Sequence, residues 1–160
     1  MGKASIRLRP ETDREPRDQY AALPWRSTAS GEIEILLITS RETRRWVIPK
    51  GWLMKDIGPG GSAAQEALEE AGVLGRLGKK PVGKYVYDKR LRSGRLQHVR
   101  VRVFALEVLQ EVAAWPEMAE RTRQWFPLAE AAGLVDEPDL KRLLSAFAPK
   151  AGGAAKDGGR

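Results

Sequence analysis

The stretch GWLMKDIGPGGSAAQEALEEAGV, residues 51–73, decides how the centre of this chain folds. Residues 55–61 hold three glycines and a proline, a composition that predicts a loop. Ser62 and Gln65 have the S-x-x-Q spacing of a capping box, so Ser62 is the predicted N-cap of a helix. Gly72 is a typical C-terminal stop, and the helix is expected to end just before it.

Three glutamates share one face of this predicted helix. Glu66, Glu69 and Glu70 stand at positions i, i+3 and i+4, where like charges repel. No Lys or Arg lies three or four positions from them on the same helix, so no helical ion pair relieves the repulsion. A hard divalent cation such as Mg²⁺ or Mn²⁺ prefers carboxylate oxygens and is the predicted partner. Taken alone, an E-x-x-E-E pattern more often marks a solvated acidic helix face.

The flanking sequence predicts a sheet for this helix to pack on. The helix face opposite the acids, Ala64, Leu68 and Ala71, is apolar and mostly small, which permits a close approach. Residues 138–147 have leucines at helical spacing and predict a closing amphipathic helix. The fold class is therefore α/β or α+β. Strands are predicted at residues 32–40, 46–48, 83–88, 98–109 and 121–126, with a hairpin turn at Ser93-Gly94.

The length of 160 residues suits one domain. Residues 1–18 mix charge and proline without periodicity and predict a flexible arm, and residues 149–160 are rich in Gly, Ala and Lys and predict a disordered tail. The domain is therefore expected to span residues 19–148. The sequence contains no repeat and no feature that assigns an oligomeric state.

Composition excludes several kinds of site. Cysteine is absent, so disulfides and thiolate metal sites are impossible. His98 is the only histidine. All multi-histidine metal sites are therefore excluded, and so is any Ser-His-Asp triad that would use a histidine other than His98. No apolar run is long enough for a membrane span or a secretory signal, so no membrane partner is predicted and the cytoplasm is the expected location. The net charge of +7 favours a polyanionic partner or serves solubility alone.

Residues 51–73 as a whole resemble the Nudix box, with the pattern G-x5-E-x7-R-E-U-x-E-E-x-G-U in which U is aliphatic. Two positions depart from it: Ile57 replaces the loop glutamate, and Gln65 replaces an arginine that supports the catalytic glutamates in that family. Gln65 retains the ability to donate a hydrogen bond. The matching residues are Gly51, Glu66, Ala67, Glu69, Glu70, Gly72 and Val73.

The resemblance implies a fold, a metal and a reaction. The fold is an α/β/α sandwich with a mixed central sheet, and the reaction is metal-assisted hydrolysis of a phosphoanhydride, a pyrophosphatase activity. Glu66, Glu69 and Glu70 would bind Mg²⁺ or Mn²⁺, and Glu66 or Glu69 would take the proton of the attacking water. A further acidic ligand is expected outside the box, at Glu117 or Glu120.

Three further stretches, AALPWR (residues 21–26), RRWVIPKGW (44–52) and ERTRQWFPL (120–128), resemble the Nudix subgroup of diphosphoinositol and diadenosine polyphosphate hydrolases. This implies a polyphosphorylated small-molecule substrate held by arginines and lysines. His98 is the leading candidate for a phosphate contact, although an exposed strand histidine without a role is an equal alternative. The expected substrate-binding residues are Arg44, Lys50, Gly51, His98 and Arg100.

Two other classes of function compete with this one. A Nudix-fold module that binds a phosphorylated metabolite or RNA, without catalysis, would explain the changes at Ile57 and Gln65. Such a module has no need of the three helix carboxylates, which repel polyanions. A basic nucleic-acid-binding domain is disfavoured because the sequence has no helix-turn-helix, zinc or repeated aromatic signature.

Overall fold

The computed structural model describes residues 17–150 as one mixed sheet with helices on both faces. Residues 1–16 of the predicted arm and 151–160 of the predicted tail lie outside the described residues. Arg17 and Asp18 form the start of the first described strand. No helix among residues 17–150 is long and apolar enough to cross a membrane.

The sheet has eight strands and is mixed. β2 lies at its centre, antiparallel to β3 and β5 and parallel to β8, and β8 in turn pairs with β6 and β7. β3 also pairs with β4 and β9. The strands are β2 (Arg17–Ser27), β3 (Ile33–Thr39), β4 (Trp46–Val47), β5 (Lys50–Trp52), β6 (Val73–Leu77), β7 (Gly83–Arg90), β8 (Leu96–Glu111) and β9 (Arg123–Pro127).

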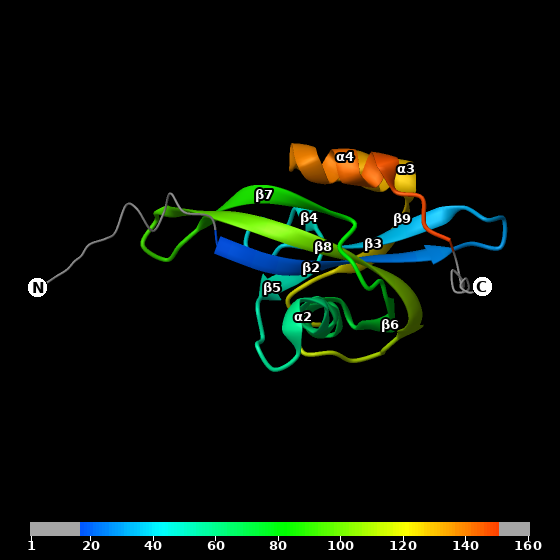
Figure 1. The fold of residues 1–160 in the computed structure, drawn as a ribbon, viewed down its shortest axis with the longest axis horizontal. Coiled ribbons are helices and arrows are strands. Elements are labelled where there is room, and N and C mark those ends of the chain that lie inside the picture. Colours follow the sequence, from blue (N-terminus) through cyan, green and yellow to red (C-terminus); the bar gives the residue numbers. More distant parts are fainter. Residues whose placement is uncertain (1–16, 151–160) are drawn as a thin grey trace, which may run out of the picture.

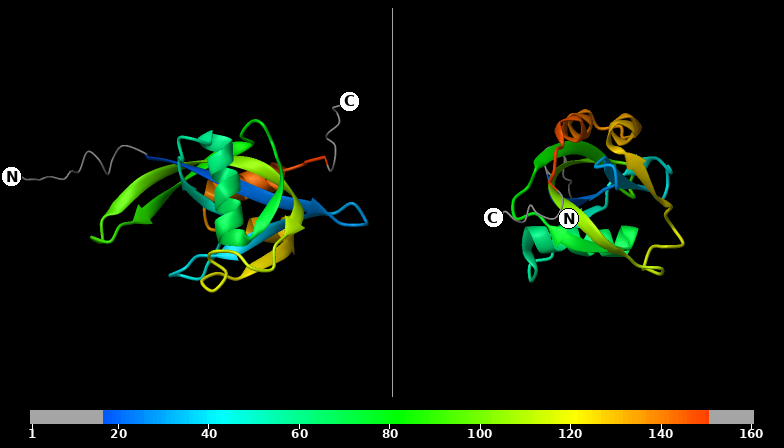
Figure 2. Two further views of the ribbon diagram at one scale, coloured as in Figure 1. Left: turned by 90° about the horizontal axis from the view of Figure 1, so that it is seen from below. Right: turned by 90° about the vertical axis from the view of Figure 1, so that its right-hand side faces the viewer.

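Helices cover both faces of the sheet, which confirms the predicted sandwich (Figure 1; Figure 2, right). On one face, α2 (Gly58–Glu66) continues directly into a π-helical segment, η2 (Ala67–Ala71). On the other face lie α3 (Leu128–Leu134) and α4 (Pro138–Ala146). Each side has its own hydrophobic core, because side chains of one strand point alternately to the two faces.

The predicted strands and the closing helix are confirmed, with shifted ends. β7 and β8 form the predicted hairpin, with Gly94 at the turn, and β9 starts at Arg123 rather than at Arg121. In β8 the side chains alternate between the two faces, since Val101 packs in the α4 core and Phe104 packs in the α2 core. The strands β2, β5 and β6 and the helix α3 were not predicted.

The predicted helix start was wrong. The helix begins at Gly58, with Ile57 as its N-cap residue and Pro59 in its first turn. Ser62 lies inside the helix, where its hydroxyl donates to the Gly58 carbonyl (2.7 Å) and accepts from the Met54 amide (2.7 Å). Gly60 lies in the helix despite its low helix propensity, and a Cβ there would lie 3.1 Å from the Leu77 side chain, a tight contact.

The apolar face of the helix also differs from the expectation. Ala63, Ala67 and Ala71 are fully buried against the sheet, whereas Ala64 and Leu68 are only half-buried. These three alanines recur every four positions on one side of the helix, and their small side chains let the helix backbone lie close to the sheet. This close approach fixes the acidic face relative to the strands.

Gly72 ends the helix in the left-handed conformation (φ 68°), and a Cβ there would lie 2.6 Å from both Arg123 Nη1 and the Trp115 ring. Gly94 also has positive φ (92°) but open space around it. We expect Gly94→Ala to cost about 1 kcal/mol from backbone strain alone, and Gly72→Ala to cost roughly 3 kcal/mol because side chains must also move. Urea unfolding of the two variants measures this difference, and equal losses would show that Gly72 is needed only for its φ.

Candidate active site

A cleft of about 630 Å³ opens where β5, the α2–η2 helix, β7 and the β8–β9 connection meet. Its acidic base is made by Glu66, Glu69 and Glu70 of the helix together with Glu117 of the connection. The remainder of the lining is mixed, with two further acids, Glu42 and Asp88, and six basic side chains. The basic side chains are Arg41 and Arg45 from the β3–β4 loop, Lys50 from β5, Lys89 and Arg90 from β7, and Arg121 from the connection.

The helix glutamates are held by contacts from three directions. Glu70 is 9% exposed, and its Oε1 accepts a hydrogen bond from the Lys50 amide (3.3 Å). Glu69 Oε2 accepts from the Gln65 side-chain amide (2.7 Å). Glu66 lies against the backbone of Gly51, and any Cβ at that position would collide with the Glu66 carboxylate. Glycine at position 51 is therefore required by the acidic base of the cleft.

Burial dominates the electrostatics of this base. It raises the pKa of Glu66 to about 8, and repulsion by the neighbouring Glu70 carboxylate adds to the rise. Burial also raises the pKa of Glu70, although Arg121 and Lys50 oppose this shift. For Lys50, burial lowers the pKa to about 8, against the attraction of Glu70. Each shift shows that the protein keeps charges here at a cost in desolvation.

Arg121 supplies the guanidinium nearest to the buried acids. Its side chain is 9% exposed and bonds to Glu117 Oε1 (2.7 Å) and to the Thr39 carbonyl (3.2 Å), and it lies 3.5 Å from Glu70 Oε2. The sequence analysis did not propose Arg121 as a site residue. The signal was present in ERTRQWFPL, a stretch singled out for its resemblance, but its spacing does not say which arginine points inward.

The donor set fits a hard divalent cation in chemistry, because the base of the cleft consists of carboxylates that lack enough cations of their own. Among residues 17–150, no three Asp, Glu or His side chains lie close enough together to surround an ion. The carboxyl groups of Glu66 and Glu70 are close enough that repulsion by Glu70 raises the pKa of Glu66. A cation bound by both carboxylates would relieve that repulsion.

The structure brings together five of the predicted site residues, namely Glu66, Glu69, Glu70, Lys50 and Gly51. It adds Glu117 to the same cleft, whereas Glu120 lies outside it in an ion pair with Arg41 (3.3 Å). Of the two expected acidic ligands outside the helix, Glu117 is therefore the one with access to the carboxylates.

Three predicted substrate contacts do not line the cleft. Arg44, at φ 58°, donates to the Glu120 carbonyl (3.0 Å). His98 Nδ1 lies 3.0 Å from Asp88 Oδ1, and Arg100 donates from Nε to Asp18 (2.8 Å). Each charge is thus engaged by a neighbour outside the acidic base.

The two departures from the box pattern have different surroundings. Ile57 is exposed and does not line the cleft, so its change leaves the carboxylates untouched. Gln65 does not form the predicted capping box. Its side-chain amide donates a hydrogen bond to Glu69, in line with the expectation that it retains this ability. Of the two departures, Gln65 is therefore the one that affects the carboxylates, because its neutral amide lies beside them.

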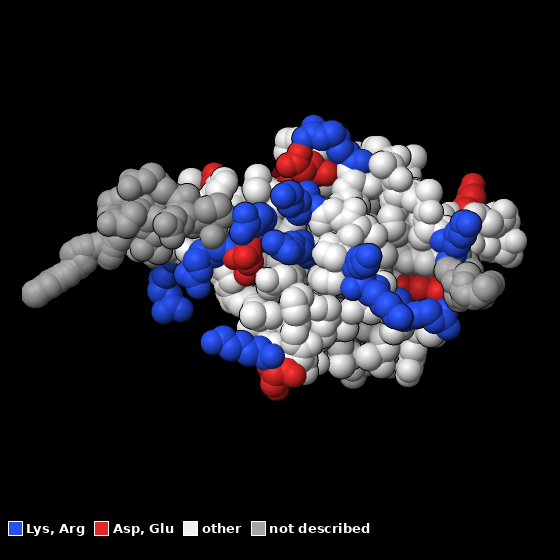
Figure 3. Space-filling view, in the orientation of Figure 1, with Lys and Arg blue, Asp and Glu red and all other residues white. Residues whose placement is uncertain are grey.

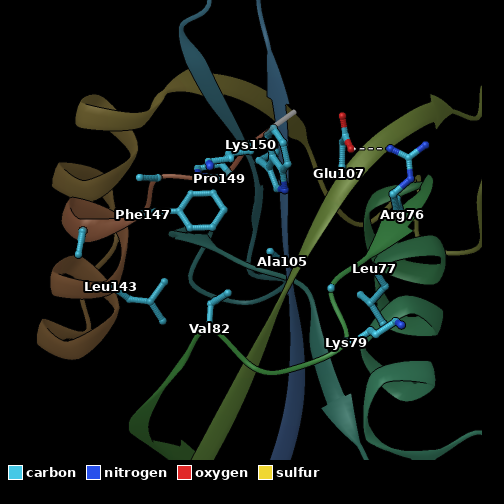
Figure 4. A pocket seen from close by; sticks show the side chains of 14 residues that line it. Arg76, Leu77, Lys79, Val82, Ala105, Glu107, Leu143, Phe147, Pro149 and Lys150 are labelled. Carbon is cyan, nitrogen blue, oxygen red and sulfur yellow. Dashed lines mark hydrogen bonds and ion pairs between the residues drawn. The ribbon is translucent and has the colours of Figure 1, made fainter. Parts of the chain in front are cut away.

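A second hollow, of about 680 Å³, lies at the other end of the sheet between α4 and the β6–β7 connection (Figure 4). Its lining is mainly apolar, with Val82, Leu143 and Phe147 facing into it. Its one acidic residue, Glu107, pairs with Arg76 (2.9 Å). The hollow shares no lining residue with the carboxylate cleft and offers no cluster of reactive groups.

The excess of basic residues does not form one continuous patch on the face shown in Figure 3. Lys and Arg outnumber Asp and Glu there, but they are spread over the surface, and most acidic groups lie beside basic ones. A nucleic-acid interface would require a continuous basic stripe. This face gives no support to that class.

Comparison with known proteins identifies the family. The model of the NUDIX domain matches residues 18–147, and the chain therefore belongs to the Nudix family. Nudix hydrolase 21, chloroplastic, of Arabidopsis thaliana is 32% identical over 137 residues, covering 82% of this chain and 66% of that protein. Diphosphoinositol polyphosphate phosphohydrolase 3-beta of Homo sapiens is 32% identical over 117 residues, covering 72% of this chain and 66% of that protein.

The chain spans between about half and two thirds of the length of the curated relatives it matches. Solved structures share the fold. The Ap4A hydrolase of C. elegans has a TM-score of 0.59 at 19% identity, covering 82% of this chain and 95% of that one. The NUDIX domain of Shewanella oneidensis NrtR, complexed with ADP ribose, has a TM-score of 0.60 at 12% identity, covering 86% and 90%. Some relatives are named chloroplastic or mitochondrial, so the cytoplasmic location stays a prediction.

The raised pKa of Glu66 predicts a pH dependence of stability. A carboxyl group whose pKa is about 8 when folded and near 4.5 when unfolded holds its proton more tightly in the folded state. The metal-free protein should therefore lose stability as the pH rises from about 5 towards 8. We expect Glu66→Gln to flatten this decline.

Urea unfolding in EDTA between about pH 5 and 7 measures the effect, a range in which Lys50, with a pKa of about 8, stays largely protonated. Glu130→Gln on the exposed side of α3 is the matched control and should keep the wild-type slope. If the free energy of unfolding of Glu66→Gln fell with pH as steeply as that of the wild type, Glu66 would not be the buried group whose charge is unfavourable.

Proposed function

We propose that the chain is a metal-dependent pyrophosphohydrolase that cleaves a phosphoanhydride bond in a polyphosphorylated small molecule. One observation carries the proposal: four carboxylates form the base of a cleft whose other walls carry six Lys and Arg side chains among neutral residues and two further acids. A polyphosphate needs both parts, because cations bind its remote phosphates while the reacting phosphate requires a divalent ion. The family and the names of the curated relatives support the same reaction class.

The proposed metal is Mg²⁺ or Mn²⁺, held by Glu66, Glu69 and Glu70 with Glu117 beside them. When bound, such an ion polarises the phosphoryl oxygens and lowers the pKa of the attacking water. The chain supplies the rest. The half-buried carboxylates of Glu66 and Glu69 line the cleft, and one of them accepts the proton of the water. Separate Glu66→Gln and Glu69→Gln variants distinguish the base from a pure ligand.

The proposed substrate is of the diphosphoinositol or diadenosine polyphosphate type. Its support is the set of cleft cations together with a curated relative named diphosphoinositol polyphosphate phosphohydrolase and the shared fold of an Ap4A hydrolase. A screen of the purified protein with Mg²⁺ against diphosphoinositol phosphates, dinucleoside polyphosphates, nucleoside triphosphates and ADP-ribose tests the proposal. Release of phosphate or mononucleotide from none of them would overturn it.

A binding module is the second candidate. It is favoured by one specific observation, the neutral Gln65 in place of a supporting arginine, and a NUDIX domain in complex with ADP ribose shares this fold. The two candidates separate in one experiment. A binding module would bind a polyphosphate without hydrolysing it. The Ile57→Glu, Gln65→Arg double variant would then gain no hydrolytic activity.

Glu70→Gln should lower kcat by at least about 100-fold while leaving the fold intact. The substitution removes one carboxylate charge at almost constant volume, and without metal it also removes part of the repulsion with Glu66. Steady-state kinetics at millimolar Mg²⁺ and thermal unfolding in EDTA measure the two effects. Full activity would rule out the assignment of the carboxylates.

The phosphate-binding wall should be formed by β7 residues that line the cleft. We expect a Lys89→Gln, Arg90→Gln double variant to raise KM by roughly tenfold for a hexaphosphate substrate and by less for a diphosphate. The matched comparison is His98→Gln with Arg100→Gln, from residues of β8 that do not line the cleft. A larger KM effect in the second variant would place the phosphates on β8 instead.

A further inference from the structure

We infer that Arg121 is a positioning residue that fixes the metal-binding carboxylates, in the place of the arginine that the helix lacks at Gln65. The inference rests on the proposed function, because it concerns the same cleft. Arg121 would supply the support for the carboxylates that this Nudix box lacks at position 65.

The guanidinium of Arg121 contacts two acids from different segments. Its Nε donates to Glu117 (2.7 Å), and its Nη2 lies 3.5 Å from Glu70. A third contact, from Nη1 to the Thr39 carbonyl (3.2 Å), ties the group to the end of β3. Since these contacts use all three nitrogens of a planar group, the two carboxylates are held at a fixed distance and angle from the sheet.

The backbone around Arg121 is fixed as well. Thr39 and Thr122 exchange hydrogen bonds, from Thr39 N to Thr122 O (3.0 Å) and from Thr122 N to the Thr39 hydroxyl (2.9 Å). The Glu117 amide donates to the Glu69 carbonyl (3.0 Å), which ties the same connection to the end of the helix. Arg121 therefore acts from a rigid support, as a positioning group must.

The helix itself cannot supply this cation. Neither Lys nor Arg occurs between Gly58 and Ala71, and the amide of Gln65 reaches only Glu69. Arg121 approaches Glu70 from the opposite side, through the β8–β9 connection. An arginine at position 65 would place a cation on the helix. In this chain the β8–β9 connection provides the cation instead, as Arg121.

Positioning is distinct from phosphate binding. The Arg121 side chain is 9% exposed, and its nitrogens are directed to Glu117, Glu70 and Thr39 rather than to open space. The other arginines of the cleft are more exposed, for example Arg41, whose side chain is 58% exposed. Loss of Arg121 should therefore change metal binding and kcat more than KM for the polyphosphate.

The test uses Arg121→Gln, Gln65→Arg and the double variant of the full chain. Mn²⁺ binding is measured by the loss of the free-ion EPR signal, which needs no activity, and kcat and KM are measured alongside. We expect Arg121→Gln to weaken Mn²⁺ binding by about tenfold or more and to lower kcat, with little change in KM. Gln65→Arg should restore most of the loss in the double variant and have a small effect alone, so the two positions are coupled.

Two further variants keep the result interpretable. Arg121→Lys keeps the charge but not the three-way contact, and should fall between wild type and Arg121→Gln even if the latter is poorly folded. Arg142→Gln on the exposed side of α4 is the matched control for net charge and should bind Mn²⁺ as the wild type does.

Tighter Mn²⁺ binding by the Arg121→Gln variant would overturn the inference, because it would show that the Arg121 guanidinium competes with the metal ion for the carboxylates. A raised KM with unchanged kcat would assign Arg121 to the phosphates instead. The absence of rescue by Gln65→Arg would refute the replacement of one arginine by the other. A wild type that binds Mn²⁺ but hydrolyses nothing would refute the proposed function and leave the binding test standing, whereas failure to bind Mn²⁺ would refute both.

Discussion

The close burial of Glu66 and Glu70 is the unfavourable interaction on which the cleft depends. Burial and mutual repulsion both raise the pKa of Glu66, so the fold must provide compensation from outside the helix. It does so with the Lys50 amide and the Arg121 guanidinium, both directed at Glu70. In the proposed function a divalent ion completes this compensation.

The helix must also be held rigidly against such repulsion. Its buried alanines bring it close to the sheet, and its C-terminal carbonyls are bonded from outside. Arg123 donates to the carbonyls of Ala71 and Gly72 (3.0 and 3.1 Å), and the Trp115 indole donates to the Glu70 carbonyl (3.2 Å). The orphan carbonyls of the helix end are thus satisfied by Trp115 of the β8–β9 connection and by Arg123, the first residue of β9. The same connection carries Glu117 and Arg121, so one segment both fixes the helix and completes the site.

The positive net charge has several separate uses. Some arginines are structural, as Arg26 is in its ion pair with Glu34 (2.8 Å) and its stacking on Trp125. Others compensate buried acids, and the lysine and arginine of β7 that line the cleft have a substrate role in the proposed function. A net charge summed over the chain cannot separate these uses, because a guanidinium serves whichever acceptor the fold places beside it.

The sequence by itself determined the acidic helix, its end at Gly72, most strands and the family, because these depend on spacing along the chain. It could not determine that the helix starts at Gly58, because a stretch with three glycines and a proline has a low helix propensity and predicts a loop. Nor could it select Lys89 over His98, or Arg121 over Arg44, as cleft residues. Those choices depend on which strand face and which connection converge on the carboxylates, and only tertiary structure brings such distant residues together.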